Sequence, residues 1–283
     1  MTLRRVFGLL FAVLVGVASV AGYGAFDEQQ RRWVFQPGQR TWVAASKPIP
    51  GMQDVWIKFT SHADGSSVKL HGLWLPQVSP RAPSLLYLHG RRSDVRSSTA
   101  RIRRMHSLGF SVLAIDYRGF GKSSAVLPSE ATATEDARQA WDWLGARVPG
   151  APRYIFGHSL GGAIAVQLAT DSHTDGLAGL MLEGTFTSVP DVFSTMAWGW
   201  LPVGPLITQR FDSAARIAKL RAPLLIVHGS EDKLIRPELG RALYERAPEP
   251  KRFVLVKGGA HHNTNAVAEA QYRQAVSEFF GLR

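Results

Sequence analysis

Residues 153–170 read RYIFGHSLGGAIAVQLAT, a short β-favouring apolar run followed by small and aliphatic residues at helical spacing. This order predicts a strand that meets a helix with almost no loop between them. The junction carries the pattern G-x-S-x-G around Ser159, which is typical of a nucleophile elbow. So tight a turn strains the serine backbone and requires glycine two positions before and after it, where Gly157 and Gly161 stand. A serine between glycines can also be only a helix cap, but the flanking strand and helix favour a nucleophile.

Outward from this junction, the chain alternates between strand and helix patterns. Apolar runs typical of buried strands occupy residues 84–88, 111–115, 153–156, 177–182, 223–227 and 252–256. Helical patterns occupy residues 99–108, 131–147, 237–246 and 267–280, in addition to the one that begins at Leu160. Two further runs, residues 55–59 and 68–75, flank the turn signal Asp64-Gly65 and predict an antiparallel hairpin. The alternation predicts an α/β fold with a mainly parallel central sheet, helices on both faces and ligands bound beyond the carboxyl ends of the strands.

Composition narrows the class of protein. The 283 residues are 45% hydrophobic, enough for the core of one large domain, which we expect over residues 29–283. The sequence has no cysteine, so disulfides, thiol catalysis and cysteine-ligated metal sites are excluded. The net charge of +11 favours anionic surfaces, either nucleic acid or acidic lipid headgroups. Because the sequence contains no aromatic-basic RNA motif and no zinc-finger spacing, we expect no nucleic acid partner.

The N-terminus carries a membrane-targeting pattern. Arg4 and Arg5 precede residues 6–26, an uncharged stretch of about 21 residues that is long enough to cross a bilayer. Residues 1–28 are therefore predicted to be a membrane anchor, or a signal peptide cleaved near the small residues Ser19-Val20-Ala21. The two arginines predict a cytoplasmic N-terminus and a domain on the extracytoplasmic side, periplasmic or secreted if the segment is cleaved. A nearby bilayer would also account for the excess of arginine.

A serine nucleophile needs an acid and a histidine, which follow it in that order along a sheet of this kind. Asp232 comes directly after the strand pattern at 223–227 and a short turn, and is the predicted acid. Its alternatives are a simple turn or cap residue at this position, its neighbour Glu231, and Glu183, which also follows a strand pattern.

Two adjacent histidines, His261 and His262, lie in the glycine-rich loop after the last strand pattern. One of them is expected to be the base, with its other ring nitrogen donating to the acid. Adjacent histidines can also bind a metal. Because the sequence offers no third or fourth ligand at a suitable spacing, we expect no metal site.

Two backbone N–H groups are expected to stabilise an oxyanion beside Ser159. One is the amide of Leu160, and the other is the amide of Arg91 in the loop that follows His89-Gly90. The side chains of Arg91 and Arg92 either attract a phosphate or carboxylate on the substrate or lie in solvent.

Several motifs together resemble the α/β-hydrolase superfamily: His89-Gly90, DYRGFGKS at 116–123, GHSLGG at 157–162, HGSED at 228–232 and GAHHN at 259–263. More narrowly, they are similar to its membrane-anchored, lid-poor branch of serine aminopeptidase-like and lysophospholipase-like hydrolases. The likeness extends from Phe35 to the C-terminus. That branch often ends its last strand with a His-Asn pair, which selects His262 as the base. It commonly carries Asn-Ala/Gly-Gly where this chain has Arg91-Arg92-Ser93, and the resemblance implies that Arg118 only braces loops.

The resemblance implies a serine hydrolase that cleaves an ester, less readily an amide, through an acyl-enzyme on Ser159, Asp232 and His262, with no cofactor. The substrate is expected to be a small-molecule or lipid ester. Acyl transfer on the same triad and a non-catalytic, membrane-tethered binding protein are the alternatives. Haloalkane or epoxide chemistry is disfavoured because it needs aspartate in place of Ser159.

Two segments around the predicted sheet are irregular in pattern. Residues 33–49 are rich in aromatic residues and proline and are predicted to drape over a sheet edge or a core seam. Residues 187–220 form a short cap-like insert with room for one or two helices, too small for a full lid. The apolar side chains of this insert either guide an acyl chain to Ser159 or pack a helix onto the sheet.

Overall fold

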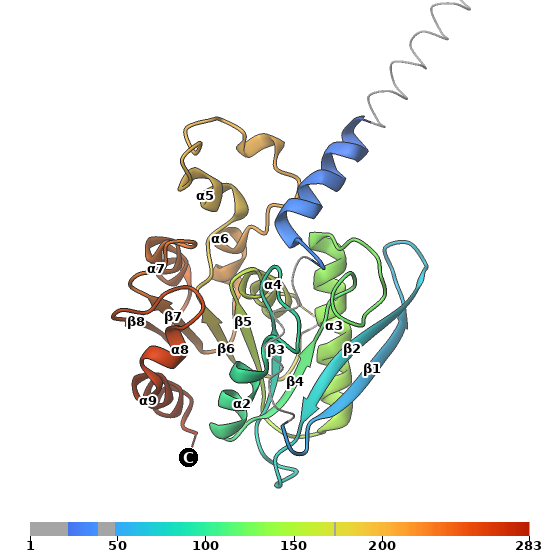
Figure 1. Cartoon of the computed structure of the whole chain (residues 1–283). Coiled ribbons are helices and arrows are strands. Elements are labelled where there is room, and N and C mark those ends of the chain that lie inside the picture. The colour runs from blue at the N-terminus through green and yellow to red at the C-terminus, as the bar shows by residue number, and fades with distance from the viewer. Residues whose placement is uncertain (1–21, 39–48, 173, 283) are drawn as a thin grey trace, which may run out of the picture.

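The computed structural model describes residues 22–38, 49–172 and 174–282. Within them the chain forms a single eight-stranded sheet, ordered β1-β2-β4-β3-β5-β6-β7-β8 (Figure 1). The strands are β1 (Gln53–Thr60), β2 (Ser67–Leu75), β3 (Ser84–Leu88), β4 (Ser111–Ile115), β5 (Arg153–His158), β6 (Leu177–Glu183), β7 (Leu224–Gly229) and β8 (Lys251–Val256). β2 pairs antiparallel with β1 and with β4, and the other pairings are parallel. The predicted hairpin and the mainly parallel sheet are both confirmed.

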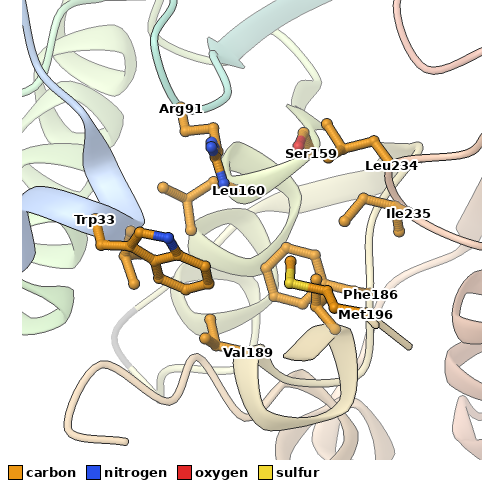
Figure 2. A pocket seen from close by; sticks show the side chains of 11 residues that line it. Trp33, Arg91, Ser159, Leu160, Phe186, Val189, Met196, Leu234 and Ile235 are labelled. Atoms are coloured by element: carbon orange, nitrogen blue, oxygen red, sulfur yellow. The ribbon is translucent and has the colours of Figure 1, made fainter. Parts of the chain in front are cut away.

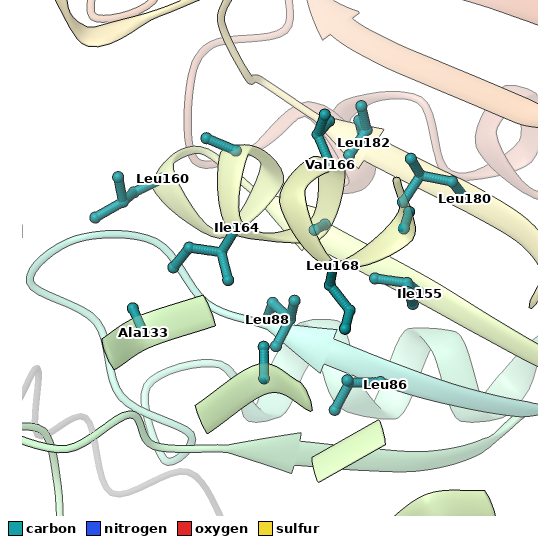
Figure 3. Packing of buried hydrophobic residues seen from close by; sticks show 14 of the residues in the cluster. Leu86, Leu88, Ala133, Ile155, Leu160, Ile164, Val166, Leu168, Leu180 and Leu182 are labelled. Atoms are coloured by element: carbon teal, nitrogen blue, oxygen red, sulfur yellow. The ribbon is translucent and has the colours of Figure 1, made fainter. Parts of the chain in front are cut away.

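Helices cover both faces of this sheet. They are α2 (Thr99–Ser107), α3 (Glu130–Arg147), α4 (Leu160–Ala169), α7 (Pro237–Arg246), α8 (Thr264–Val267) and α9 (Glu269–Phe280). Side chains of α3, α4 and α7 share one core cluster, and side chains of α2 and α9 share the other. β3, β4 and β7 are buried along their whole length because alternate side chains serve the two clusters, as Leu86 and Tyr87 of β3 do. Figure 3 shows Leu86 and Leu88 packed with Ile164 and Leu168 of α4.

The C-terminal helical region is divided in two, unlike the single helix predicted from the sequence. One helix was expected over 267–280, but the structure has two, α8 and α9, separated at Ala268 with φ −129° and ψ 53°. The consequence is local, because α9 still buries Tyr272 and Val276 against the sheet.

The insert at 187–220 lies beyond the carboxyl ends of the parallel strands (Figure 1). It contains α5 (Val189–Ser194), α6 (Ser213–Arg216) and two 3₁₀ turns, η1 (Gly204–Leu206) and η2 (Ile217–Lys219). This agrees with the expected one or two short helices.

Residues 22–35 are helical and lie beside the insert (Figure 1). The Gln30 side chain joins the two segments, because its amide group donates to the Leu206 carbonyl at 2.8 Å and its oxygen accepts from the Thr208 N–H at 2.9 Å. Phe35 is fully buried against Phe211, with ring centroids 5.7 Å apart. Trp33 was expected to open a draped, irregular segment, and it lies instead near the end of this helix.

Most of the predicted membrane span, residues 6–21, lies outside the described residues. Among the residues that the structure does describe, no helix is both long enough and apolar enough to span a bilayer. Residues 39–48 of the predicted draped segment also fall outside them.

Arg118 is almost fully buried and joins parts of the fold that are distant in sequence. Its guanidinium donates to Asp136 at 2.6 Å and 2.9 Å, to Glu135 at 2.6 Å and to Ser61 at 3.2 Å. These contacts connect the loop that carries Arg118 to α3 and to the β1–β2 turn. Arg118 thus braces loops, as the resemblance implied.

Candidate active site

Ser159 is the single residue between β5 and α4, and its backbone is strained, with φ 56° and ψ −122°. Close backbone contacts require glycine at positions 157 and 161, two residues before and after Ser159. A Cβ on Gly157 would lie 2.4 Å from the Gly161 carbonyl oxygen, and one on Gly161 would lie 2.2 Å from the Leu88 oxygen. The predicted strand–serine–helix turn is therefore present, and it holds the serine side chain above the carboxyl end of β5.

The structure places Ser159, His261 and Asp232 in one hydrogen-bonded row. The Ser159 Oγ lies 3.0 Å from His261 Nε2, and His261 Nδ1 lies 2.7 Å from Asp232 Oδ2. All three residues are buried. With the Nδ1 proton donated to the carboxylate, Nε2 is free to accept the serine proton.

His261 therefore occupies the position for which the sequence selected His262, and that assignment is corrected. The His262 side chain is exposed. The reason lies in the loop after β8, where the Asn263 side chain accepts a hydrogen bond from the Ala260 N–H at 2.7 Å. This closed turn directs His261 inward and His262 outward, so the His-Asn pair marks the turn and not the base.

Asp232 is held by its own loop. One carboxylate oxygen accepts from the N–H groups of Leu234 at 3.0 Å and Ile235 at 2.8 Å, which leaves the other oxygen for His261. Burial raises the pKa of Asp232, but hydrogen bonds from His228 and His261 outweigh it and hold this pKa below the ordinary value. The carboxylate is thus charged at neutral pH.

The two alternative acids lie elsewhere. Glu231 is exposed. Glu183 is fully buried and is bound by Arg101, whose Nε and Nη2 lie 3.2 Å and 3.1 Å from the same carboxylate oxygen. The structure thus favours Asp232 over both.

Arg101 of α2 also supports the histidine loop, a role that the sequence did not reveal. Its Nη2 donates to the His262 carbonyl oxygen at 3.0 Å. Beside it, the His158 Nε2 donates to the His261 carbonyl oxygen at 2.9 Å. These two hydrogen bonds therefore fix the backbone of the loop at two successive carbonyl groups, those of His261 and His262. In the sequence, Arg101 is one of several arginines on an amphipathic helix, and nothing there distinguishes it.

We expect the variant Arg101→Ala to lower kcat by about 10- to 100-fold, because small displacements of a catalytic group have effects of this size. It should also lower the free energy of unfolding by about 3–5 kcal/mol, since it leaves the Glu183 charge buried without a partner. The double variant Arg101→Met/Glu183→Met should recover much of that stability and keep the kcat defect. Urea unfolding and ester kinetics measure the two effects.

The matched control is Arg103→Ala, because Arg103 is an exposed arginine on the same helix. It should leave both kcat and the free energy of unfolding unchanged. A double variant with wild-type kcat would show that Arg101 acts only on stability.

Within the described part of the chain, His158, His261 and His262 form one group whose potential ligand atoms lie within 4.8 Å of one another. A metal ion would have to break hydrogen bonds already made, because both ring nitrogens of His261 and the Nε2 of His158 are hydrogen-bonded.

The two histidines beside His261 have lowered pKa values. Burial lowers the pKa of His158 well below its ordinary value. The His262 side chain is exposed on one side only, and its partial loss of hydration, together with nearby His261 and Arg101, lowers its pKa to about 4. Both neighbours are thus neutral at pH 7.

A small cavity of about 40 Å³ opens in front of Ser159 (Figure 2). The two residues expected to stabilise an oxyanion, Leu160 and Arg91, both line it. The remaining lining is mostly apolar: Trp33, Val34, Phe186, Val189, Val192, Met196, Leu234 and Ile235. Arg92, by contrast, is exposed and bonded to the Gln36 side chain.

The chain is similar to several known proteins. The family described as "Serine aminopeptidase, S33" matches residues 79–213 and 206–266. An uncharacterized protein of Mycobacterium tuberculosis strain H37Rv is 33% identical over 283 residues, covering 99% of this chain and 97% of that protein. The lysophosphatidylserine lipase ABHD12 of Rattus norvegicus is 34% identical over 190 residues, 60% of this chain and 47% of the lipase. The Pyrococcus furiosus esterase Pf2001 superposes with a TM-score of 0.66 at 20% identity, over 81% of this chain and 90% of the esterase.

The fold and the elbow define an α/β hydrolase. The chain belongs to the serine aminopeptidase S33 family, and it is a hydrolase enzyme.

Proposed function

We propose that the protein hydrolyses carboxylic esters through an acyl-enzyme on Ser159, with His261 as the base and Asp232 as the acid that orients it. The observation that carries this proposal is the unbroken row of contacts from Ser159 Oγ through His261 to Asp232, at 3.0 Å and 2.7 Å. Distances of this size allow a proton to pass from the hydroxyl to the imidazole without rearrangement.

Each step then has a residue to perform it. His261 Nε2 accepts the proton of Ser159 as its oxygen attacks the ester carbonyl, and the amides of Leu160 and Arg91 stabilise the resulting oxyanion. His261 returns the proton to the departing alcohol, which leaves an acylated serine. A water molecule then gives a proton to His261 and attacks the acyl group, so that the carboxylic acid is released and Ser159 recovers its proton.

The proposed substrate is a lipid ester with a single acyl chain. The apolar lining of the cavity suits such a chain, and one relative is a lysophosphatidylserine lipase. The Arg91 side chain at the same cavity offers a cation for a phosphate or carboxylate headgroup. We further propose that residues 6–26 anchor the enzyme in a membrane with its domain on the extracytoplasmic side, which would bring the site close to such lipids.

The test is a substrate panel on the purified full chain in detergent: p-nitrophenyl butyrate, a lysophospholipid and an aminoacyl p-nitroanilide. We expect turnover of both esters, far slower cleavage of the anilide, and loss of all three activities in Ser159→Ala. Faster cleavage of the anilide would make the enzyme a peptidase. An inactive wild-type protein would favour the non-catalytic binding role instead.

A further inference from the structure

The helical segment at 22–35 forms part of the active-site wall. Trp33 and Val34 line the cavity in front of Ser159 together with side chains of the insert. Figure 2 shows Trp33 beside Val189 of the insert. Trp33 is 41% exposed, so much of its ring is not packed into the protein core. Its one described ring contact with a cation is to Arg91, whose guanidinium carbon lies 5.9 Å from the ring centroid.

A second, larger cavity of about 420 Å³ lies between the same helical segment and the insert. Its lining is mostly apolar: Phe26, Gln29, Gln30, Trp33, Val34, Val189, Phe193, Val203, Leu206 and Ile207. The amide group and the oxygen of Gln30 are both bonded to the insert backbone, so this side chain closes the joint between the segments and does not call for a polar ligand. Phe26 and Leu206 remain 46% and 58% exposed, which leaves apolar surface open to a further apolar group.

The two cavities meet at Trp33, Val34 and Val189, each of which lines both of them. An apolar chain attached at Ser159 therefore reaches the outer cavity by crossing these three side chains. Of the three, Trp33 is the most exposed and the largest, while Val34 and Val189 are buried. Displacing the Trp33 ring is thus the simplest way to widen the passage.

We infer that the second, outer cavity binds the distal part of the substrate's acyl chain. The Trp33 ring lies between the two cavities and limits the length of acyl chain that can reach the outer one. This inference rests on the proposed ester hydrolysis and adds a site to it. The cavity lies beside the helical segment that follows residues 6–21 in the chain, and these residues are uncharged, mostly apolar in sequence and part of the membrane anchor that we propose. The occupant is a long alkyl chain, because the lining offers dispersion and apolar contact but no charged side chain.

Two variants test the inference in opposite directions. Val203→Trp fills the outer cavity and should lower kcat/KM for p-nitrophenyl laurate and palmitate by about tenfold or more, because several buried methylenes lose their contacts. It should leave p-nitrophenyl acetate unchanged, since this acyl group ends in the inner cavity. Trp33→Ala joins the two cavities and should raise the laurate-to-acetate ratio of kcat/KM by about tenfold.

Trp56→Ala is the matched control. Trp56 is 39% exposed, similar to Trp33, but it lies on the edge strand β1 with its ring under Lys69, and it lines neither cavity. Its laurate-to-acetate ratio should equal that of the wild type. Each ratio is measured on one preparation at one detergent concentration, so a partial loss of folded protein cancels.

Wild-type ratios in both Val203→Trp and Trp33→Ala would overturn the inference and leave ester hydrolysis standing. An equal loss for acetate and laurate in Val203→Trp would also overturn it, because the outer cavity would then have no preference for long chains. A wild-type protein that hydrolyses neither acetate nor laurate would instead refute the proposed function itself.

Discussion

Replacing His261 with alanine is expected to lower kcat/KM for a short-chain ester by about 10⁴- to 10⁶-fold, the range found when the base of a serine triad is removed. The same substitution at His262 should lower it by less than about tenfold. Only His261 lies within hydrogen-bond distance of both Ser159 and Asp232, while the described contact of His262 with Arg101 is made by its backbone carbonyl and survives the substitution. Steady-state kinetics with p-nitrophenyl butyrate measure both effects.

The adjacent histidines act as controls for each other, because both substitutions remove an imidazole from the same loop. Circular dichroism and thermal unfolding verify that each variant is folded. A large loss in His262→Ala together with an active His261→Ala would reverse the assignment and return the base to the residue that the sequence selected.

The second large effect is expected for Asp232→Asn, which should lower kcat/KM by about 10⁴-fold with little change in stability. The N–H groups of Leu234 and Ile235 donate to one oxygen of Asp232, and an asparagine oxygen would keep both bonds. Its NH₂ group would then face His261 Nδ1 and donate to it. The remaining imidazole proton would move to Nε2, where it would point at Ser159 and block proton transfer.

Glu231→Gln is the control for this prediction, since Glu231 is the exposed acid directly beside Asp232 and should tolerate the change. Retention of more than about a tenth of the activity in Asp232→Asn would mean that Asp232 does not set the histidine tautomer. The measurement is kcat/KM on p-nitrophenyl butyrate for both variants, with unfolding curves to exclude a loss of folded protein.

Local sequence patterns predicted much of the fold and part of the candidate site. The glycine spacing around Ser159 follows from a steric requirement within a few residues, so the turn could be predicted and the structure has it. The buried strands were found in the same way, because their apolar runs need no information from elsewhere in the chain. The position of Asp232 followed from its place at a strand end, and the structure brings it to a histidine.

The features that the sequence missed depend on contacts between distant segments. The choice of His261 over His262 is made by the turn that Asn263 closes, and the two residues are alike in the sequence. Arg101 and Glu183 are 82 residues apart, and their pairing appears only when the fold brings the Arg101 side chain of α2 to the end of β6. Likewise, nothing in the residues around Trp33 indicates that it lines the cavity of Ser159.

The central claim is that Ser159 is a nucleophile activated by His261. Its most direct test is covalent labelling of the full chain with a fluorophosphonate, followed by peptide mass spectrometry. The wild type and His262→Ala should carry one adduct on Ser159, His261→Ala should label at least about 100-fold more slowly, and Ser159→Ala should carry none. An adduct on another residue, or equal labelling rates in the wild type and His261→Ala, would contradict it.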